Sequence, residues 1–196
     1  MSDPPFSSLV VIGVSTGGVD ALQRLLGGLS PAFPLPVAVV AHISPDSGDG
    51  LPRLLDDLSP IRVREGGDFV PMEPGVVFIA PPGYHLLVDR EGFLTLSLDP
   101  PECHARPSID VLFESAAYAF GRGVVGVILT GAGFDGARGL SLIARRGGVT
   151  VVQDPEDAVA DLMPRAACAA TTPDYVAPLV AIPGLITEIV TRRRKG

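Results

Sequence analysis

The sequence predicts an α/β protein with a doubly wound, mostly parallel sheet, in a Rossmann-like three-layer arrangement. Short apolar runs rich in β-branched residues alternate with segments of helical periodicity along most of the 196 residues. This alternation is typical of βαβ units, whose right-handed crossovers bring the carboxyl ends of the strands to one edge of the sheet. One segment differs: residues 84–89 and 93–98 flank a short turn at 90–92 and predict an antiparallel hairpin.

The first element is a buried strand over residues 9–14, because a continuous apolar run ends abruptly at Ser15 among glycines. A helix follows at once, since Val19, Leu22 and Leu25 recur at helical spacing. The other elements expected in this half are strands over 37–41, 61–65 and 76–80 and an amphipathic helix over 51–58.

The second half continues the alternation. Ser108 is placed to cap a helix over 109–120, with Asp110 in the first turn. The strongest strand, over 124–130, leads into a glycine-rich loop that ends at Asp135. Next come a helix over 137–146, a strand over 149–153, a short helix over 164–170, a strand fragment at 175–176 and a helix over 179–194.

The composition indicates one globular domain over residues 1–196, with its core at about 9–192. The chain is 46% hydrophobic and 19% charged, and its net charge of −7 argues against a nucleic-acid binder. Cys103 and Cys168 are isolated, so no disulfide framework or metal-ligand spacing is indicated. Residues 1–8 lack a secretion signal and no apolar run approaches a membrane span, so we expect a cytoplasmic protein with no membrane insertion.

Ser15, His42 and Asp135 each come just after a predicted strand, which places all of them at the carboxyl edge of the sheet, where ligands bind. A serine, a histidine and a carboxylate are the groups that acyl transfer needs, because a base must activate the hydroxyl and a third group must orient the base. The backbone N–H of Thr16, at a helix N-terminus, points where an oxyanion would form, and the loop at Gly131 could supply a second donor.

Each of these residues also has a plainer interpretation. Ser15 in a G-x-S-x-G turn fits a turn residue or an anion cradle as well as a nucleophile. His42 could be a structural histidine at a strand end whose ring nitrogens are hydrogen-bonded within the protein, and Asp135 could cap the helix that follows it. His85, in the hairpin, and His104, in an irregular stretch, are weaker candidates for the base because neither follows a parallel strand.

A binding module that holds an anion or nucleotide without chemistry is therefore one alternative. The turn lacks the third glycine of the dinucleotide fingerprint, and His42 stands where an acidic ribose-binding residue is expected.

Several ordered motifs resemble the catalytic domain of the chemotaxis protein-glutamate methylesterases of the CheB type, over about residues 10–190. They are Ile12-Gly13-Val14-Ser15-Thr16-Gly17-Gly18, Ala41-His42, Ile79-Ala80-Pro81, Arg106-Pro107-Ser108-Ile109-Asp110-Val111-Leu112-Phe113, Gly126-Val127-Ile128-Leu129-Thr130-Gly131 with Asp135-Gly136, and Met163-Pro164-Arg165.

The resemblance implies a catalytic triad of Ser15, His42 and Asp135, with Thr16 and Ala132 holding the oxyanion. It implies hydrolysis of γ-glutamyl methyl esters on the cytoplasmic helices of chemoreceptors, which releases methanol, with deamidation of some receptor glutamines. It implies no metal and no organic cofactor. A related triad esterase or amidase acting on another substrate is the alternative within enzymes.

The chain departs from the family pattern in three respects. Ser15 lies too near Met1 for the receiver domain that usually precedes this domain, so we expect a stand-alone domain or a fragment, with a separate response regulator as a candidate partner. The loop that usually reads Gly-Met-Gly-Asn-Asp-Gly has Ala132 and Phe134 instead of methionine and asparagine. The stretch 43–45 after His42 also differs from the usual Met-Pro-Pro type.

Overall fold

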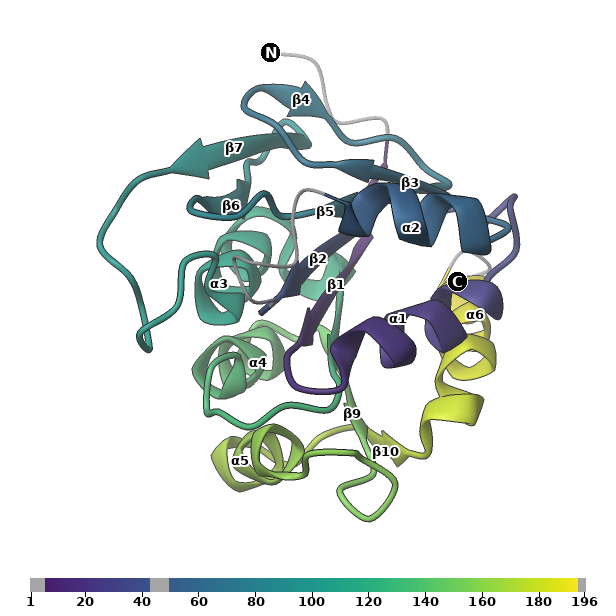
Figure 1. The fold of residues 1–196 in the computed structure, drawn as a ribbon, viewed down its shortest axis with the longest axis vertical. Helices are drawn as coiled ribbons and strands as arrows, with labels where there is room; N and C mark the ends of the chain where they lie inside the picture. The colour runs from purple at the N-terminus through teal and green to yellow at the C-terminus, as the bar shows by residue number, and fades with distance from the viewer. Residues whose placement is uncertain (1–5, 43–49, 194–196) are drawn as a thin grey trace.

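A computed structural model describes residues 6–42 and 50–193 and has a parallel sheet of seven strands at its centre (Figure 1). The strand order is β10-β9-β8-β1-β2-β5-β3, and every pairing in this sheet is parallel. Its strands are β1 (Leu9–Val14), β2 (Val37–Ala41), β3 (Arg62–Glu65), β5 (Val76–Ile79), β8 (Val124–Ile128), β9 (Val149–Gln153) and β10 (Tyr175–Ala177). The predicted fold class is confirmed.

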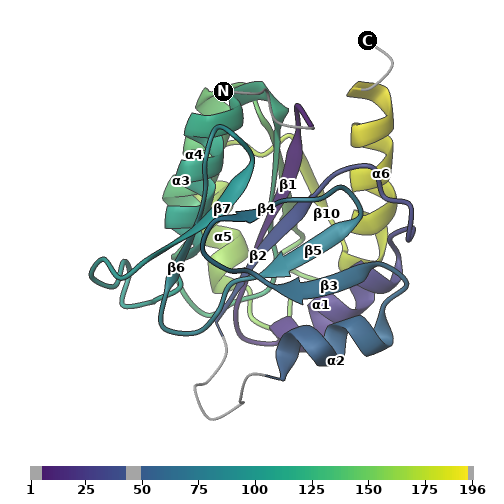
Figure 2. The same ribbon diagram turned by 90° about the horizontal axis from the view of Figure 1, so that it is seen from above.

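Helices cover both faces of this sheet, which gives the three layers seen in Figures 1 and 2. The core clusters place α1, α2 and α6 on one face and α3, α4 and α5 on the other. The helices are α1 (Gly18–Gly27), α2 (Leu51–Leu58), α3 (Ile109–Phe120), α4 (Ala137–Arg145), α5 (Leu162–Ala170) and α6 (Ile182–Arg193), with 3₁₀ turns at Gly121–Gly123 and Leu179–Ala181. None of the helices in the described ranges is both long and apolar enough to cross a membrane.

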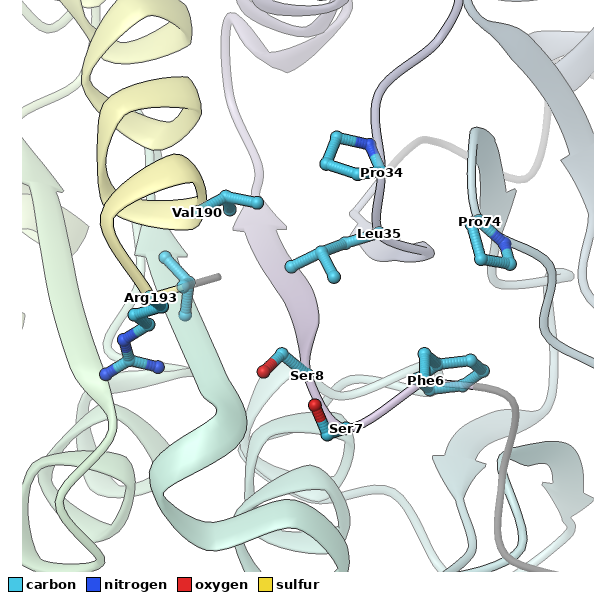
Figure 3. Close-up of a pocket in the computed structure, with 9 residues that line it drawn as sticks. Phe6, Ser7, Ser8, Pro34, Leu35, Pro74, Val190 and Arg193 are labelled. Atoms are coloured by element: carbon cyan, nitrogen blue, oxygen red, sulfur yellow. The ribbon is translucent and has the colours of Figure 1, made fainter. Parts of the chain in front are cut away.

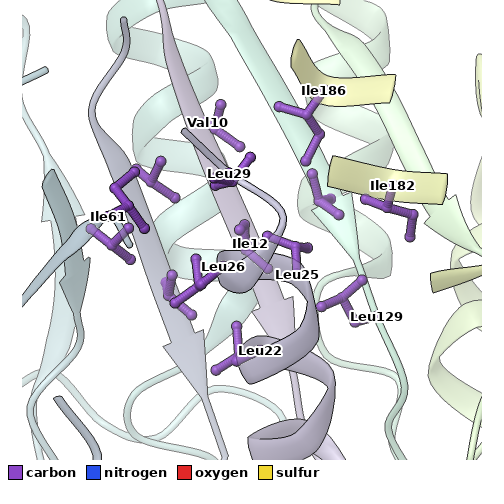
Figure 4. Close-up of a cluster of buried hydrophobic side chains, with 14 of the residues drawn as sticks. Val10, Ile12, Leu22, Leu25, Leu26, Leu29, Ile61, Leu129, Ile182 and Ile186 are labelled. Carbon is purple, nitrogen blue, oxygen red and sulfur yellow. The ribbon is translucent and has the colours of Figure 1, made fainter. Parts of the chain in front are cut away.

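The two hydrophobic cores follow from the alternation of side chains along β1. Val10 and Ile12 point to the core beneath α1 and α6, which Figure 4 shows with Leu22 and Ile186. Leu9 and Val11 point to the other core, beneath α3, α4 and α5. A strand buried on both faces needs apolar residues at every position, which is why its sequence is a continuous apolar run.

The predicted hairpin is present, but it belongs to a small sheet of three strands. Strand β6 (His85–Val88) pairs antiparallel with β7 (Phe93–Ser97), as expected. The additional strand β4 (Val70–Pro71) pairs with β7 and was not predicted, because two residues are too short to show a strand period.

Some element ends differ from the predicted ones. Strand β8 stops at Ile128, two residues early, although Leu129 still donates a hydrogen bond to Gly13. The last helix begins at Ile182, because the segment after Pro178 first forms a 3₁₀ turn. Ser108 does stand at the N-cap of α3, but its side chain makes no capping hydrogen bond, so the predicted role is wrong.

Candidate functional site

Ser15 lies in the turn between β1 and α1, at the carboxyl edge of the sheet. Its backbone N–H donates to Thr130 O at 2.9 Å, and its carbonyl accepts from Gly18 N at 2.7 Å. Gly17 has φ 78°, a left-handed conformation that favours glycine. These constraints hold the half-buried Ser15 side chain at the start of α1.

The loop after β8 packs directly against this turn. The Thr130 hydroxyl donates to Thr16 O at 2.9 Å and accepts from Ala160 N at 2.9 Å. A methyl group on Gly131 would lie 2.9 Å from Cβ of Ser15 and 2.7 Å from Cε of Met163, closer than carbon atoms pack. Glycine at this position therefore lets the loop approach the serine.

Asp135 is buried, with a relative exposure of 3%, and both of its carboxylate oxygens accept hydrogen bonds. Oδ1 accepts from Ser108 Oγ at 2.8 Å and from Asp110 N at 2.9 Å, and Oδ2 accepts from Ile109 N at 2.7 Å. Asp135 thus caps α3, a helix distant in sequence. The alternative that it caps the following helix is not borne out, because Gly136 is the N-cap of α4 and has no side-chain partner.

His42 follows β2 and approaches the same carboxylate. Its Nε2 lies 3.0 Å from Oδ2 of Asp135, although the ring N–H is not aimed along the line between the two atoms. Such contacts are often poorly aligned without substrate. Nε2 thus faces the carboxylate, and Nδ1, the other ring nitrogen, makes no hydrogen bond to a residue that the structure describes.

The pKa of Asp135 reflects two opposing effects. Burial raises it, but the contact with His42 and the hydrogen bonds from Asp110, Ile109 and Ser108 outweigh burial and hold the pKa below its ordinary value. Asp135 is therefore a carboxylate at neutral pH, and it can stabilise positive charge on the imidazole.

Ser15 and His42 line one open pocket of about 260 Å³. Its other lining residues are Thr16, Gly17, Gly18, Val19, Asp20 and Ala41. Within the described ranges no hydrogen bond joins Ser15 to His42. Thr16 and Ala132 are exposed residues, and their backbone N–H groups donate to no other residue that the structure describes.

The structure thus brings Ser15, His42 and Asp135 to one edge of the sheet and separates the other two histidines from them. His104 is exposed, and His85 is buried against Ser108. The contact of Ser108 with Asp135 was missed. The only signal in the sequence is that Ser108 precedes a helix, and helix capping explains that position equally well. The departure at 43–45 lies outside the described residues.

One group of side chains has the composition of a metal site, because ligand atoms of Cys103, Asp110 and Asp135 lie within 4.8 Å of one another. It does not fit a cation. Both oxygens of Asp135 already accept hydrogen bonds, and Oδ1 of Asp110 accepts from Gly139 N at 2.7 Å. The Asp135 carboxylate therefore links the loop before α4 to α3, and the Asp110 carboxylate links α3 to α4.

A separate pocket of about 420 Å³ lies at the other end of β1 (Figure 3). Ser7 and Ser8 line it just before β1 begins, whereas Ser15 follows the end of that strand. This pocket is therefore not part of the serine site.

The fold is a parallel α/β sheet with a serine at a strand–turn–helix junction, and a histidine and a buried aspartate lie at the same edge. These are the side chains that α/β hydrolases use for acyl transfer. Comparison with known families makes this specific. The family model "CheB methylesterase" matches residues 10–186, and the chain belongs to this family.

Relatives and a solved structure agree with that assignment. The chain is 42% identical to a putative protein-glutamate methylesterase/protein-glutamine glutaminase of Leptospira interrogans, over 92% of this chain and 93% of the relative. It is 43% identical to the protein-glutamate methylesterase FrzG of Myxococcus xanthus, over 95% of this chain but 56% of that protein. The CheB methylesterase catalytic domain of Thermotoga maritima superposes with a TM-score of 0.88 at 34% identity, over 93% of this chain and 98% of that domain.

Proposed function

We propose that this protein hydrolyses methyl esters of glutamate side chains on chemoreceptors and deamidates some receptor glutamines. The names of its relatives support hydrolysis of glutamate methyl esters and deamidation of glutamine in a protein substrate. The observation that carries the proposal is the buried Asp135 carboxylate 3.0 Å from His42, which lines one pocket with Ser15.

The first step is acylation of Ser15. Its Oγ attacks the ester carbonyl carbon while Nδ1 of His42 takes the hydroxyl proton, and Asp135 stabilises the imidazolium that results. As the tetrahedral intermediate collapses, the C–O bond to the methoxy group breaks, and the proton on His42 goes to the leaving oxygen, releasing methanol. With a glutamine substrate, the same steps release ammonia.

The second step returns the serine. Water, deprotonated by His42, attacks the acyl carbon. The ester bond to Ser15 breaks, the proton on His42 returns to Oγ of Ser15, and the product is a glutamate side chain. In both steps the N–H groups of Thr16 and Ala132 donate to the developing oxyanion, since neither is used within the described structure. These residues supply all the groups that the reaction needs, so the proposal includes no metal or organic cofactor.

The proposed partners are the cytoplasmic helices of methyl-accepting receptors, and the proposed location is the cytoplasm. We also propose that residues 1–196 form a single catalytic domain. A response-regulator protein is a further proposed partner. The net charge of −7 disfavours nucleic acid as a partner.

The test is methanol release from methylated receptor by the wild-type protein and by Ser15→Ala, with circular dichroism to check the fold. Ser15→Ala is expected to abolish release, because the hydroxyl is the nucleophile. A folded Ser15→Ala variant with an undiminished rate would exclude the mechanism. Activity on small esters but on no methylated receptor would favour the related esterase.

A further inference from the structure

We propose that His85 and Ser108 are positioning residues that hold the Asp135 carboxylate in the orientation that reaches His42. This inference rests on the proposed function, since Asp135 matters for catalysis only if His42 is the base. Neither residue lines the pocket that Ser15 and His42 share, so both would act through Asp135.

The contact of Ser108 with Asp135 is buried. Ser108 is fully buried, and its hydroxyl donates to Oδ1 at 2.8 Å. Oδ1 and Oδ2 each also accept one backbone N–H from the first turn of α3. A carboxylate held at both oxygens cannot rotate about its Cβ–Cγ bond without breaking hydrogen bonds. Its plane therefore fixes where Oδ2 meets His42.

His85 holds Ser108 from the other side. This side chain is 1% exposed, and its Nδ1 accepts a hydrogen bond from Ser108 N at 3.2 Å. Its Nε2 lies 3.1 Å from Pro100 O, a carbonyl that can only accept. The two contacts require the neutral ring with its proton on Nε2. Only in that form does His85 satisfy the Ser108 N–H.

These contacts form one continuous path of hydrogen bonds that ends at the site. It begins at Pro100 O, after β7, and passes through the ring of His85 in β6 to Ser108. From the Ser108 hydroxyl it continues through Asp135 to His42. The backbone N–H of Ser108 is at the N-cap of α3, where no intrahelical acceptor exists. Loss of the His85 acceptor would leave this N–H unpaired and let the first turn of α3 shift, together with its bonds to Asp135.

A merely structural role makes a different prediction. If Ser108 only stabilised the fold, its loss would lower the free energy of unfolding but leave kcat of the folded protein unchanged. If it positions Asp135, kcat falls while KM for the methylated receptor stays the same, because neither residue contacts the substrate pocket.

The first experiment compares Ser108→Ala with Ser115→Ala in the methanol-release assay. Ser115 is a matched control on the same helix, since its hydroxyl bonds Val88 N of β6 and Leu112 O but not Asp135. We expect kcat to fall about tenfold in Ser108→Ala, the order expected from losing a hydrogen bond to a charged group, and to stay within about twofold in Ser115→Ala. Equal kcat in both variants would overturn the proposal.

The second experiment tests the acceptor at His85 by rescue. In His85→Asn the side-chain carbonyl can take the place of Nδ1 and accept from Ser108 N. His85→Gln can replace only the donor to Pro100 O, and His85→Leu replaces neither. We expect His85→Asn to retain kcat within about threefold, and the other two to lose about tenfold or more. His104→Asn, at an exposed site, is the control. Equal losses in all three His85 variants would point to packing alone.

A third readout does not depend on activity. Nitrogen NMR of the folded protein is expected to show His85 with Nε2 protonated and Nδ1 unprotonated, and the ring signals of His42 are expected to move in Ser108→Ala but not in Ser115→Ala. A His85 ring protonated on Nδ1 would overturn the proposal. The two ideas fail differently: an active Ser15→Ala variant removes the proposed function, whereas an inactive Ser15→Ala variant with an unaffected Ser108→Ala removes only the positioning role.

Discussion

Replacing Asp135 with asparagine changes one oxygen to an amide group and leaves the shape of the side chain intact. Each oxygen of Asp135 accepts a backbone N–H, so the new NH₂ group must face a donor wherever it lies. At the Oδ2 position it would face Ile109 N and would donate to Nε2 of His42, moving the imidazole proton to Nδ1. At the Oδ1 position it would face Asp110 N, while the Ser108 hydroxyl can turn to accept.

Either placement of the amide leaves one buried backbone N–H unpaired, at a cost of about 1–3 kcal/mol in the free energy of unfolding. For a chain of this size that corresponds to a fall in Tm of about 2–12 °C. With the amide nitrogen at the Oδ1 position the carbonyl still faces His42, but it lacks the charge that stabilises the imidazolium. We expect kcat to fall by about 10²–10⁴, and the upper end applies if the amide takes the Oδ2 position and fixes the wrong tautomer.

The assay measures methanol release from methylated receptor alongside urea unfolding. Asp110→Asn is the matched control, because Asp110 lies beside Asp135 and is equally buried, and burial raises the pKa of Asp110. In the Asp110→Asn variant the side-chain carbonyl would still accept from Gly139 N. It should change kcat by less than about threefold. A folded Asp135→Asn variant with kcat within about threefold of the wild type would refute the reasoning, because Asp135 would then be only a cap for α3.

Two further predictions use the same site. Gly131→Ala places a methyl group 2.9 Å from Cβ of Ser15, so we expect the serine to be displaced. In the methanol assay kcat should fall at least about tenfold, and urea unfolding should show a loss of about 1–3 kcal/mol in the free energy of unfolding. An unchanged kcat would contradict the close packing of this loop. The pKa of Asp135 is lowered overall, because its contact with His42 and its hydrogen bonds outweigh the burial that raises it. Its stabilising contribution is therefore present above the unfolded value of about 4 and lost as the pH falls through the folded value, so the difference in unfolding free energy between wild type and Asp135→Asn should narrow below about pH 4. A difference that widens on acidification would contradict this sign.

The sequence by itself determined the layered fold and the edge on which the site lies. Apolar runs such as residues 9–14 mark strands buried on both faces, and the chain direction alone decides which end of a parallel strand carries the polar residue. Ser15, His42 and Asp135 could therefore be grouped before any contact was known, and the family resemblance drawn from the same motifs is confirmed. Their chemical roles stay a prediction.

Only the tertiary structure decided how these residues are held. Strand β4 is too short to leave a period in the sequence, and it exists because β7 offers it an edge. Asp135 caps α3 rather than α4, and Ser108 bonds a carboxylate 27 positions away instead of its own helix. Periodicity encodes which face of an element is buried, because that depends on near neighbours in the chain. A hydrogen-bond partner depends on how two distant elements pack, and no local pattern records that.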